Sequence, residues 1–148
     1  MISFLFADDA PVYRDITETF FKEHLQDYDI FISDVVMTEI QKTNDAIKRA
    51  GLLDAVKTYQ LRLYGPLNAE INDLAEAYIQ QNVIPKSKME DALHVAFATF
   101  YEFDILLSWN FKHLANIKKQ IQLNAVNQTF GYIRGLSLLN PMEVICEK

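Results

Sequence analysis

The segment that most constrains the fold runs from Ser87 to Phe100, because a helix formed there is apolar on almost every side. A helix that is hydrophobic all round must be covered on all sides, so it belongs in the interior of a layered domain. Asp91 interrupts this pattern near the start of the segment. A buried carboxylate is costly unless it is paired, hydrogen-bonded or bound to a metal ion. We therefore expect Asp91 to have a structural role at the helix start or to bind a cation.

Length and composition indicate one compact domain over residues 1–148, since half of the residues are hydrophobic. The net charge of -6 disfavours broad attraction to a polyanion but leaves room for a local basic rim around a nucleic-acid cleft. Cys146 is the only cysteine, which excludes an internal disulfide. Without a signal peptide or an apolar run of roughly 18 residues, we expect a cytoplasmic protein that does not enter membranes.

Short apolar strands alternate with amphipathic helices, which predicts an α/β domain with a parallel sheet. Strands are expected at residues 30–32, 105–109 and 133–138. Helices are expected from residue 11 to about 25, from 34 to about 40 with Ser33 as the cap, at 44–63, 67–81, 87–100 with a capping box starting at Ser87, 111–114 and 117–130.

Three polar residues lie near the places where parallel sheets build sites, past the carboxyl ends of strands. Glu39 follows the strand at 30–32 by less than two helical turns, and Asn110 directly follows the strand at 105–109. Asp91 begins the helix that leads into that second strand. Carboxylates from separate segments suit Mg²⁺ or Mn²⁺, ions that activate water and stabilise the charge on a phosphodiester under attack.

Each of these residues also has an ordinary structural interpretation. Glu39 could be a solvated charge on an amphipathic helix, Asp91 a first-turn helix charge and Asn110 a cap after a strand. His94, three residues after Asp91, is more typical of a hydrogen-bonded core histidine than of a general base or metal ligand. Spacing alone does not decide between these interpretations and a metal site.

Three stretches resemble the acidic motifs of PIN domains. Ser33–Ile40 resembles the second motif, Asp91–Ala96 the third, and Asp104–Leu114 the closing strand with the fourth motif. The tail, with Gly131-Tyr132 and Asn140–Val144, is similar to the ends of bacterial PIN proteins of the VapC toxin type. The resemblance spans nearly the whole chain, and the third and fourth motifs carry most of its specificity.

This resemblance implies a three-layer α/β/α sandwich around a mostly parallel central sheet and a metal-dependent endoribonuclease of toxin–antitoxin type. Glu39 and Asp91 would be ligands of Mg²⁺ or Mn²⁺, and Asn110 would stand where an Asp is common, supplying an amide oxygen or orienting water. Metal-bound water would attack an RNA phosphodiester. The resemblance also implies an antitoxin protein as partner and a homodimer. Five lysines lie close in sequence to Asp91 and Asn110 and either rim the cleft and hold phosphates or are ordinary solvated side chains: Lys86, Lys88, Lys112, Lys118 and Lys119.

The N-terminus departs from the family pattern, because PIN domains begin with a central strand that ends in an Asp. Met1–Pro11 resembles the segment that normally comes after that strand, so we expect the strand and its Asp to be missing. In the alternative, residues 2–6 form a strand with Asp8 or Asp9 at its end. A second hypothesis is therefore a degenerate, non-catalytic PIN-like binding or assembly module. A small-molecule α/β enzyme has little support, since no nucleophile is evident.

Overall fold

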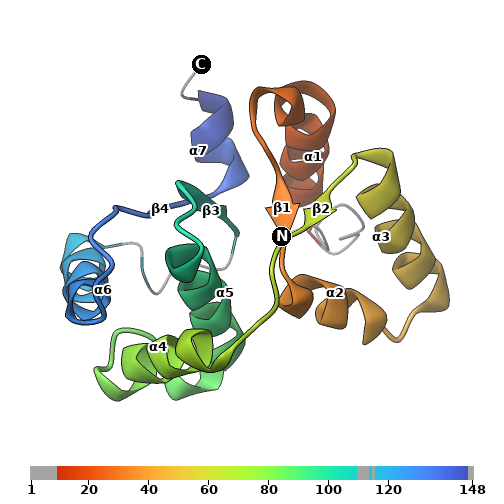
Figure 1. Cartoon of the computed structure of the whole chain (residues 1–148). Coiled ribbons are helices and arrows are strands. Elements are labelled where there is room, and N and C mark those ends of the chain that lie inside the picture. Colours follow the sequence, from red (N-terminus) through yellow and green to blue (C-terminus); the bar gives the residue numbers. More distant parts are fainter. Residues whose placement is uncertain (1–9, 110–113, 115, 147–148) are drawn as a thin grey trace. The chain divides into compact units, whose positions relative to one another are not determined.

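The structure is a computed structural model that describes residues 10–109, 114 and 116–146 (Figure 1). The chain divides into two compact units, which we call the first unit (Met1–Pro66 with Pro141–Lys148) and the second unit (Leu67–Asn140). The expectation of one domain over the whole chain stays a prediction, because each unit is described by itself. Within the described ranges, no helix is long and apolar enough to cross a membrane.

The first unit contains helical segments of 3 to 13 residues and one pair of strands. Strands β1 (Phe31–Ile32) and β2 (Arg62–Leu63) pair in parallel, with Phe31 opposite Arg62 and Ile32 opposite Leu63. The connection between them holds two helices, as parallel pairing requires. The helical elements of the unit are α1 (Pro11–Thr19), the π-helix η2 (Phe20–His24), the 3₁₀-helix η3 (Leu25–Asp27), α2 (Asp34–Gln41), α3 (Ala46–Thr58) and α7 (Pro141–Cys146).

Helix starts in the first unit follow the predicted capping chemistry. The Ser33 hydroxyl accepts the Val36 N–H at 3.4 Å at the start of α2. The Asp45 carboxylate accepts the N–H groups of Ile47 and Lys48 at 2.9 and 3.2 Å, so α3 begins where expected. These side chains satisfy backbone donors that have no partner inside a helix.

The expected helix at 44–63 is wrong at its C-terminal end. Helix α3 stops at Thr58, and Gln60 adopts the left-handed conformation with φ of 53°. The Leu61 N–H then donates to the Val56 carbonyl at 3.0 Å, which closes the helix and turns the chain. Residues 62–63 pair with β1 instead, because backbone bonding to a neighbouring strand outweighs a weak helical preference.

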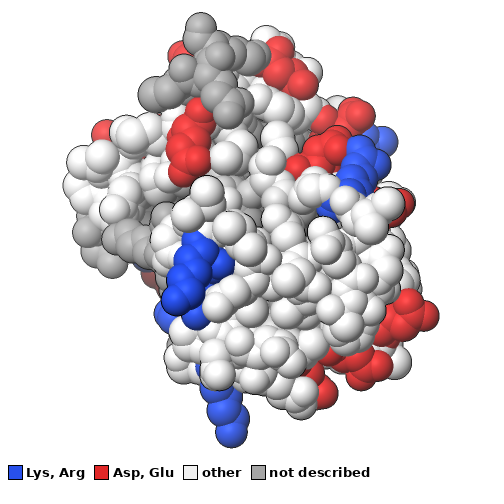
Figure 2. All heavy atoms as spheres, turned by 90° about the vertical axis from the view of Figure 1, so that its left-hand side faces the viewer, with Lys and Arg blue, Asp and Glu red and all other residues white. Residues whose placement is uncertain are grey.

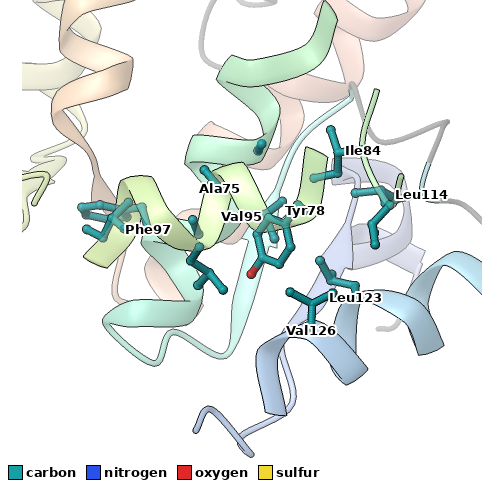
Figure 3. Close-up of a cluster of buried hydrophobic side chains, with 13 residues drawn as sticks. Ala75, Tyr78, Ile84, Val95, Phe97, Leu114, Leu123 and Val126 are labelled. Carbon is teal, nitrogen blue, oxygen red and sulfur yellow. The ribbon is translucent and has the colours of Figure 1, made fainter. Parts of the chain in front are cut away.

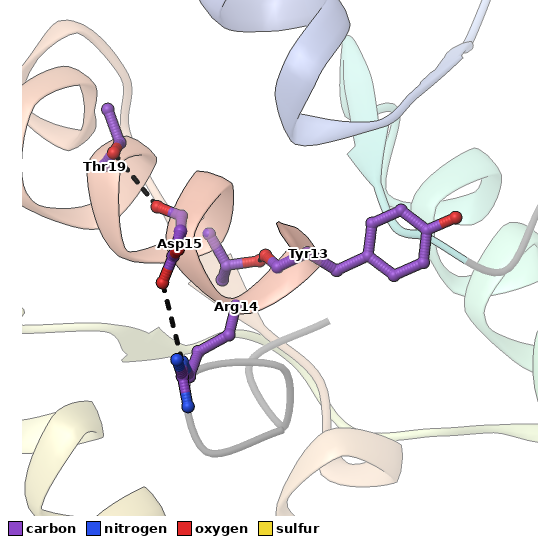
Figure 4. A network of polar contacts seen from close by, with 5 residues as sticks. Tyr13, Arg14, Asp15 and Thr19 are labelled. Atoms are coloured by element: carbon purple, nitrogen blue, oxygen red, sulfur yellow. Dashed lines mark hydrogen bonds and ion pairs between the residues drawn. The ribbon is translucent and has the colours of Figure 1, made fainter. Parts of the chain in front are cut away.

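The N-terminal helix changes its geometry along its length. In α1, the hydroxyls of Thr17 and Thr19 donate to the carbonyls of Tyr13 and Asp15, at 2.6 and 3.0 Å (Figure 4). Such bonds to the carbonyl four residues back compete with the helix ladder and often bend helices. Directly after them the helix widens into the π-helix η2 and then tightens into η3.

The second unit is built from three long helices and one strand pair. Strands β3 (Ile105–Leu107) and β4 (Ser137–Leu139) are parallel and in register from Ile105 opposite Ser137. The helices are α4 (Ala69–Gln80), the 3₁₀-helix η4 (Lys86–Lys88), α5 (Met89–Phe100) and α6 (Ile117–Thr129). The predicted helices at 67–81, 87–100 and 117–130 are thus present, with ends shifted by up to two residues.

Two details of the second unit differ from expectation. The capping box at Ser87 is wrong: residues 86–88 form η4, Lys88 takes the N-cap position of α5, and none of the described side chains caps that helix. The last strand starts at Ser137 rather than at residue 133. The expected helix at 111–114 falls mostly on residues outside those described, and the alternative strand at 2–6 lies entirely outside them.

Helix α5 is buried, as its all-round apolar pattern predicts. It packs against α4, and the shared core continues into α6 (Figure 3). Leu74 and Tyr78 of α4 and Val95 of α5 are almost fully inaccessible. The core side chains are Ile71, Leu74, Ala75, Tyr78, Val83, Ile84, Ala92, Val95, Ala96, Phe97, Leu114, Leu123 and Val126.

The fold is therefore a mixed α/β arrangement with parallel strand pairs, in agreement with the predicted class at this level. Each pair is joined by helices: α2 and α3 lie between β1 and β2, and α6 lies between β3 and β4. The described strands form two separate two-stranded sheets.

Candidate metal centre

Asp91 lies in the first turn of α5, beside Glu90. Its side chain is only partly buried, whereas Ala92 next to it is fully buried. We expected Asp91 to be a buried carboxylate. It is instead partly exposed, because the first turn of α5 lies at the edge of the core. A half-exposed carboxylate at a helix N-terminus is favoured by the helix dipole and can also reach a hydrated cation.

Glu39 lies on α2, between Val35, which is buried one turn earlier, and Ile40, which is buried next to it. The Glu39 side chain is half-buried, and its backbone carbonyl accepts the Thr43 hydroxyl at 3.2 Å. The Ser33 cap fixes the start of α2 directly after β1. The local sequence thus places a carboxylate on the second turn of a helix that follows a parallel strand.

Asn110 lies outside the described residues, so its amide has no described position. The chain that leads to it is described: the Ser108 N–H donates to the Leu139 carbonyl at 2.9 Å, which continues the pairing of β3 and β4. Asp8 and Asp9, the alternative first acidic residues, are outside the described residues as well.

The chain that follows α5 packs on the same core as this helix. Phe103 stacks on Phe97 with ring centroids 6.0 Å apart, and Leu106 of β3 packs against the core that α5 helps to form. His94 lies half-buried one turn after Asp91.

The candidate ligands are divided between the two units. Glu39 belongs to the first unit, whereas Asp91 belongs to the second. Among the described residues, no group of three or more His, Cys, Asp or Glu side chains could hold a metal ion. The three-residue site therefore stays a prediction about two acidic residues and one amide from distant segments.

Several lysines of the second unit lie just before α5 or at the start of α6. The Lys119 ammonium donates to the Asn82 carbonyl at 2.6 Å, which joins the start of α6 to the loop before η4. Lys86, Lys88 and Lys118 are exposed, and Lys112 is outside the described residues. On the face shown in Figure 2, Lys and Arg side chains stand in separate groups divided by uncharged surface.

A buried polar group in the second unit was missed by sequence reasoning. The Tyr78 hydroxyl donates to Asn127 Oδ1 and lies 3.4 Å from Thr99 Oγ1, and all three residues are buried. Burial raises the pKa of Tyr78 well above its ordinary value. The group joins α4, α5 and α6, so its role is structural. A polar residue at a core position of each helix is the signal that could have identified it.

Comparison with known proteins identifies no relative: no protein-family model, no curated protein and no solved structure matches the chain. Function is therefore inferred from the residues and their positions in each unit.

Proposed function

We propose that this chain is a divalent-metal-dependent endoribonuclease of the PIN type, acting in a toxin–antitoxin pair. Glu39, Asp91 and Asn110 would hold Mg²⁺ or Mn²⁺, and metal-bound water would attack an RNA phosphodiester. In this proposal the strands join one mostly parallel central sheet of a three-layer α/β/α sandwich. An antitoxin protein and a second copy of the chain are the proposed partners.

The observation that carries the proposal is the position of Asp91. It is partly exposed in the first turn of a helix whose later turns are mostly buried, and the chain continues from that helix into the parallel pair of β3 and β4. Carboxyl ends of parallel strands are common positions for functional residues. Glu39 supports the proposal by its own position, since it is half-buried on α2, the helix that directly follows the carboxyl end of β1.

Metal binding by the purified chain is the direct test. We expect Mn²⁺ to bind in a calorimetric titration, and Asp91→Asn or Glu39→Gln to weaken binding by about tenfold or more, because each removes a charged ligand. Glu90→Gln is the matched control, since Glu90 is exposed in the same turn of α5. If both ligands hold one ion, the double variant should lose less than the sum of the single losses.

Activity is measured on a labelled RNA pool with Mg²⁺ or Mn²⁺ and with a chelator. Cleavage should require the metal and disappear in Asp91→Asn but persist in Glu90→Gln. Undiminished cleavage by Asp91→Asn would rule out the proposed site.

The second candidate function is a non-catalytic PIN-like binding or assembly module. The observation that favours it is that the described residues hold no cluster of three potential His, Cys, Asp or Glu ligands, while position 110 is Asn rather than Asp. Intact chain that neither binds Mn²⁺ nor cleaves RNA would select this candidate.

A further inference from the structure

A pocket of about 690 Å³ lies entirely within the first unit. One wall comes from residues between 21 and 30, where the chain passes from the π-helix η2 through η3 towards β1. The other wall comes from residues 58–62, between the end of α3 and β2. Its volume falls in the range of small-molecule sites, about 300–1,000 Å³.

Aromatic side chains provide much of the lining. Phe21 and Tyr59 come from opposite walls and contact each other with ring centroids 5.0 Å apart. Tyr28 also lines the pocket, and its ring lies 6.3 Å from that of Phe20 in the core. Tyrosine rings anchored in this way offer flat surfaces on which a planar base can stack.

Two cationic side chains accompany the aromatic rings. Lys22 is exposed, and Arg62 is held with its guanidinium 4.7 Å from the centroid of the Phe31 ring. The Asp29 carboxylate lies 3.7 Å from the Arg62 guanidinium. Two cations against one carboxylate leave the lining net positive, although the chain as a whole carries -6. The pocket therefore favours an anionic ligand with a planar group.

The backbone of this wall is unusual in a way that fits a binding role. Phe21 and Lys22 belong to the π-helix η2, which displaces the side chains from the register of α1. Single turns of π-helix cost stability and occur frequently at functional sites. In the first unit this turn coincides with the pocket wall.

We propose that the pocket binds one nucleotide of a single-stranded RNA. The base stacks on the tyrosine rings, and Lys22 and Arg62 contact the phosphate. The choice of RNA as the source of the nucleotide rests on the proposed function. The affinity of the pocket for a base joined to a phosphate rests on the pocket alone.

Binding is tested by fluorescence anisotropy of a short labelled oligouridine with the full chain and a chelator. Without divalent metal the outcome is independent of the proposed metal centre. Tyr59→Leu should weaken binding by about tenfold, the loss expected for one stacked base. Lys22→Glu should weaken it further at low salt and reduce its salt dependence. Lys42→Glu is the matched control, because Lys42 is exposed in the same unit and does not line the pocket.

Tyr59 packs on Phe21, so circular dichroism must show that Tyr59→Leu is folded. Lys22→Glu changes an exposed side chain and gives a second, independent test. Competition with unlabelled RNA and with uridine monophosphate distinguishes the two sources of the ligand. If unlabelled RNA displaces the labelled oligouridine far more effectively than the mononucleotide does, the proposal is supported. Mononucleotide binding with no preference for RNA overturns it, as do equal RNA affinities of the wild type, Lys22→Glu and Lys42→Glu.

Discussion

The two units differ in how their buried side chains are assembled. In the second unit, α4, α5 and α6 contribute to one cluster that includes Leu74, Tyr78 and Val95. In the first unit, buried side chains come from elements of different kinds, such as Phe20 in the π-helix η2, Ile32 in the strand β1 and Leu52 in the helix α3. Three helices that share one buried cluster each pack against the same apolar side chains.

We infer from this difference that the second unit contributes more to stability and the first unit more to binding. The second unit is expected to resist local opening, because its helices contact one another through buried apolar side chains. The first unit holds the π-helix and the pocket, features that lower local stability and can serve a ligand. Substitutions in each unit can test that contrast.

The largest expected effect comes from the shared core of the second unit. Leu74→Ala should lower the free energy of unfolding by about 3 kcal/mol, since it removes a buried side chain and leaves a cavity. Urea unfolding followed by fluorescence of Trp109, the sole tryptophan, reports on this unit. Leu52→Ala, buried in the first unit, should shift the Trp109 transition much less. Equal shifts would mean that the units unfold together and would remove the contrast.

The buried polar group should give the next effect. Tyr78→Phe removes the hydroxyl and leaves Asn127 and Thr99 buried without that partner. We expect a loss of about 2 kcal/mol in the same urea experiment. A double-mutant cycle with Asn127→Ala measures the coupling, and a coupling near zero would show that the hydroxyl bond contributes nothing.

Alkaline pH should weaken the second unit through the same residue. Burial raises the pKa of Tyr78, so the unfolded chain loses this proton near pH 10 while the folded chain keeps it. The contribution is complete below that pH and falls as pH rises, by about 1.4 kcal/mol per pH unit. Urea unfolding of the wild type and of Tyr78→Phe at rising pH isolates the effect. Parallel stability curves above pH 10 would contradict it.

The smallest effects are expected at helix ends, where both units use the same device. Gln60 after α3 and Glu102 after α5 adopt left-handed conformations with φ of 53° and 58°. Gln60→Gly and Glu102→Gly should each stabilise the chain by about 0.5–1 kcal/mol, because glycine adopts this conformation without strain. Asn82→Gly is the matched control at φ of 58° and should gain less, since asparagine tolerates this region. Thermal unfolding measures all three.

Sequence patterns predicted the second unit better than the first. Helices at 69–80, 89–100 and 117–129 follow from apolar periodicity, because each buries one face against its neighbours. Strand β2 was missed because two residues carry no period, and its pairing with β1 depends on a partner far along the chain. The pocket was missed for the same reason, since its walls lie about thirty residues apart.

The sequence predicts the positions of two proposed metal ligands on their helices but not how exposed their side chains are. Local sequence places Asp91 in the first turn of α5 and Glu39 on α2 after a Ser33 cap. The exposure of Asp91 was not predictable, because it depends on how far the first turn of α5 stands outside the core.

The amino-acid sequence alone determined where most helices lie, which helix is buried and which residues cap several of them, because these properties depend on neighbours within one or two turns. Folding in three dimensions decided the strand pairing, the Tyr78 hydrogen bonds and the pocket of the first unit. Those features join residues distant in the chain, and their energies depend on partners that no local pattern specifies.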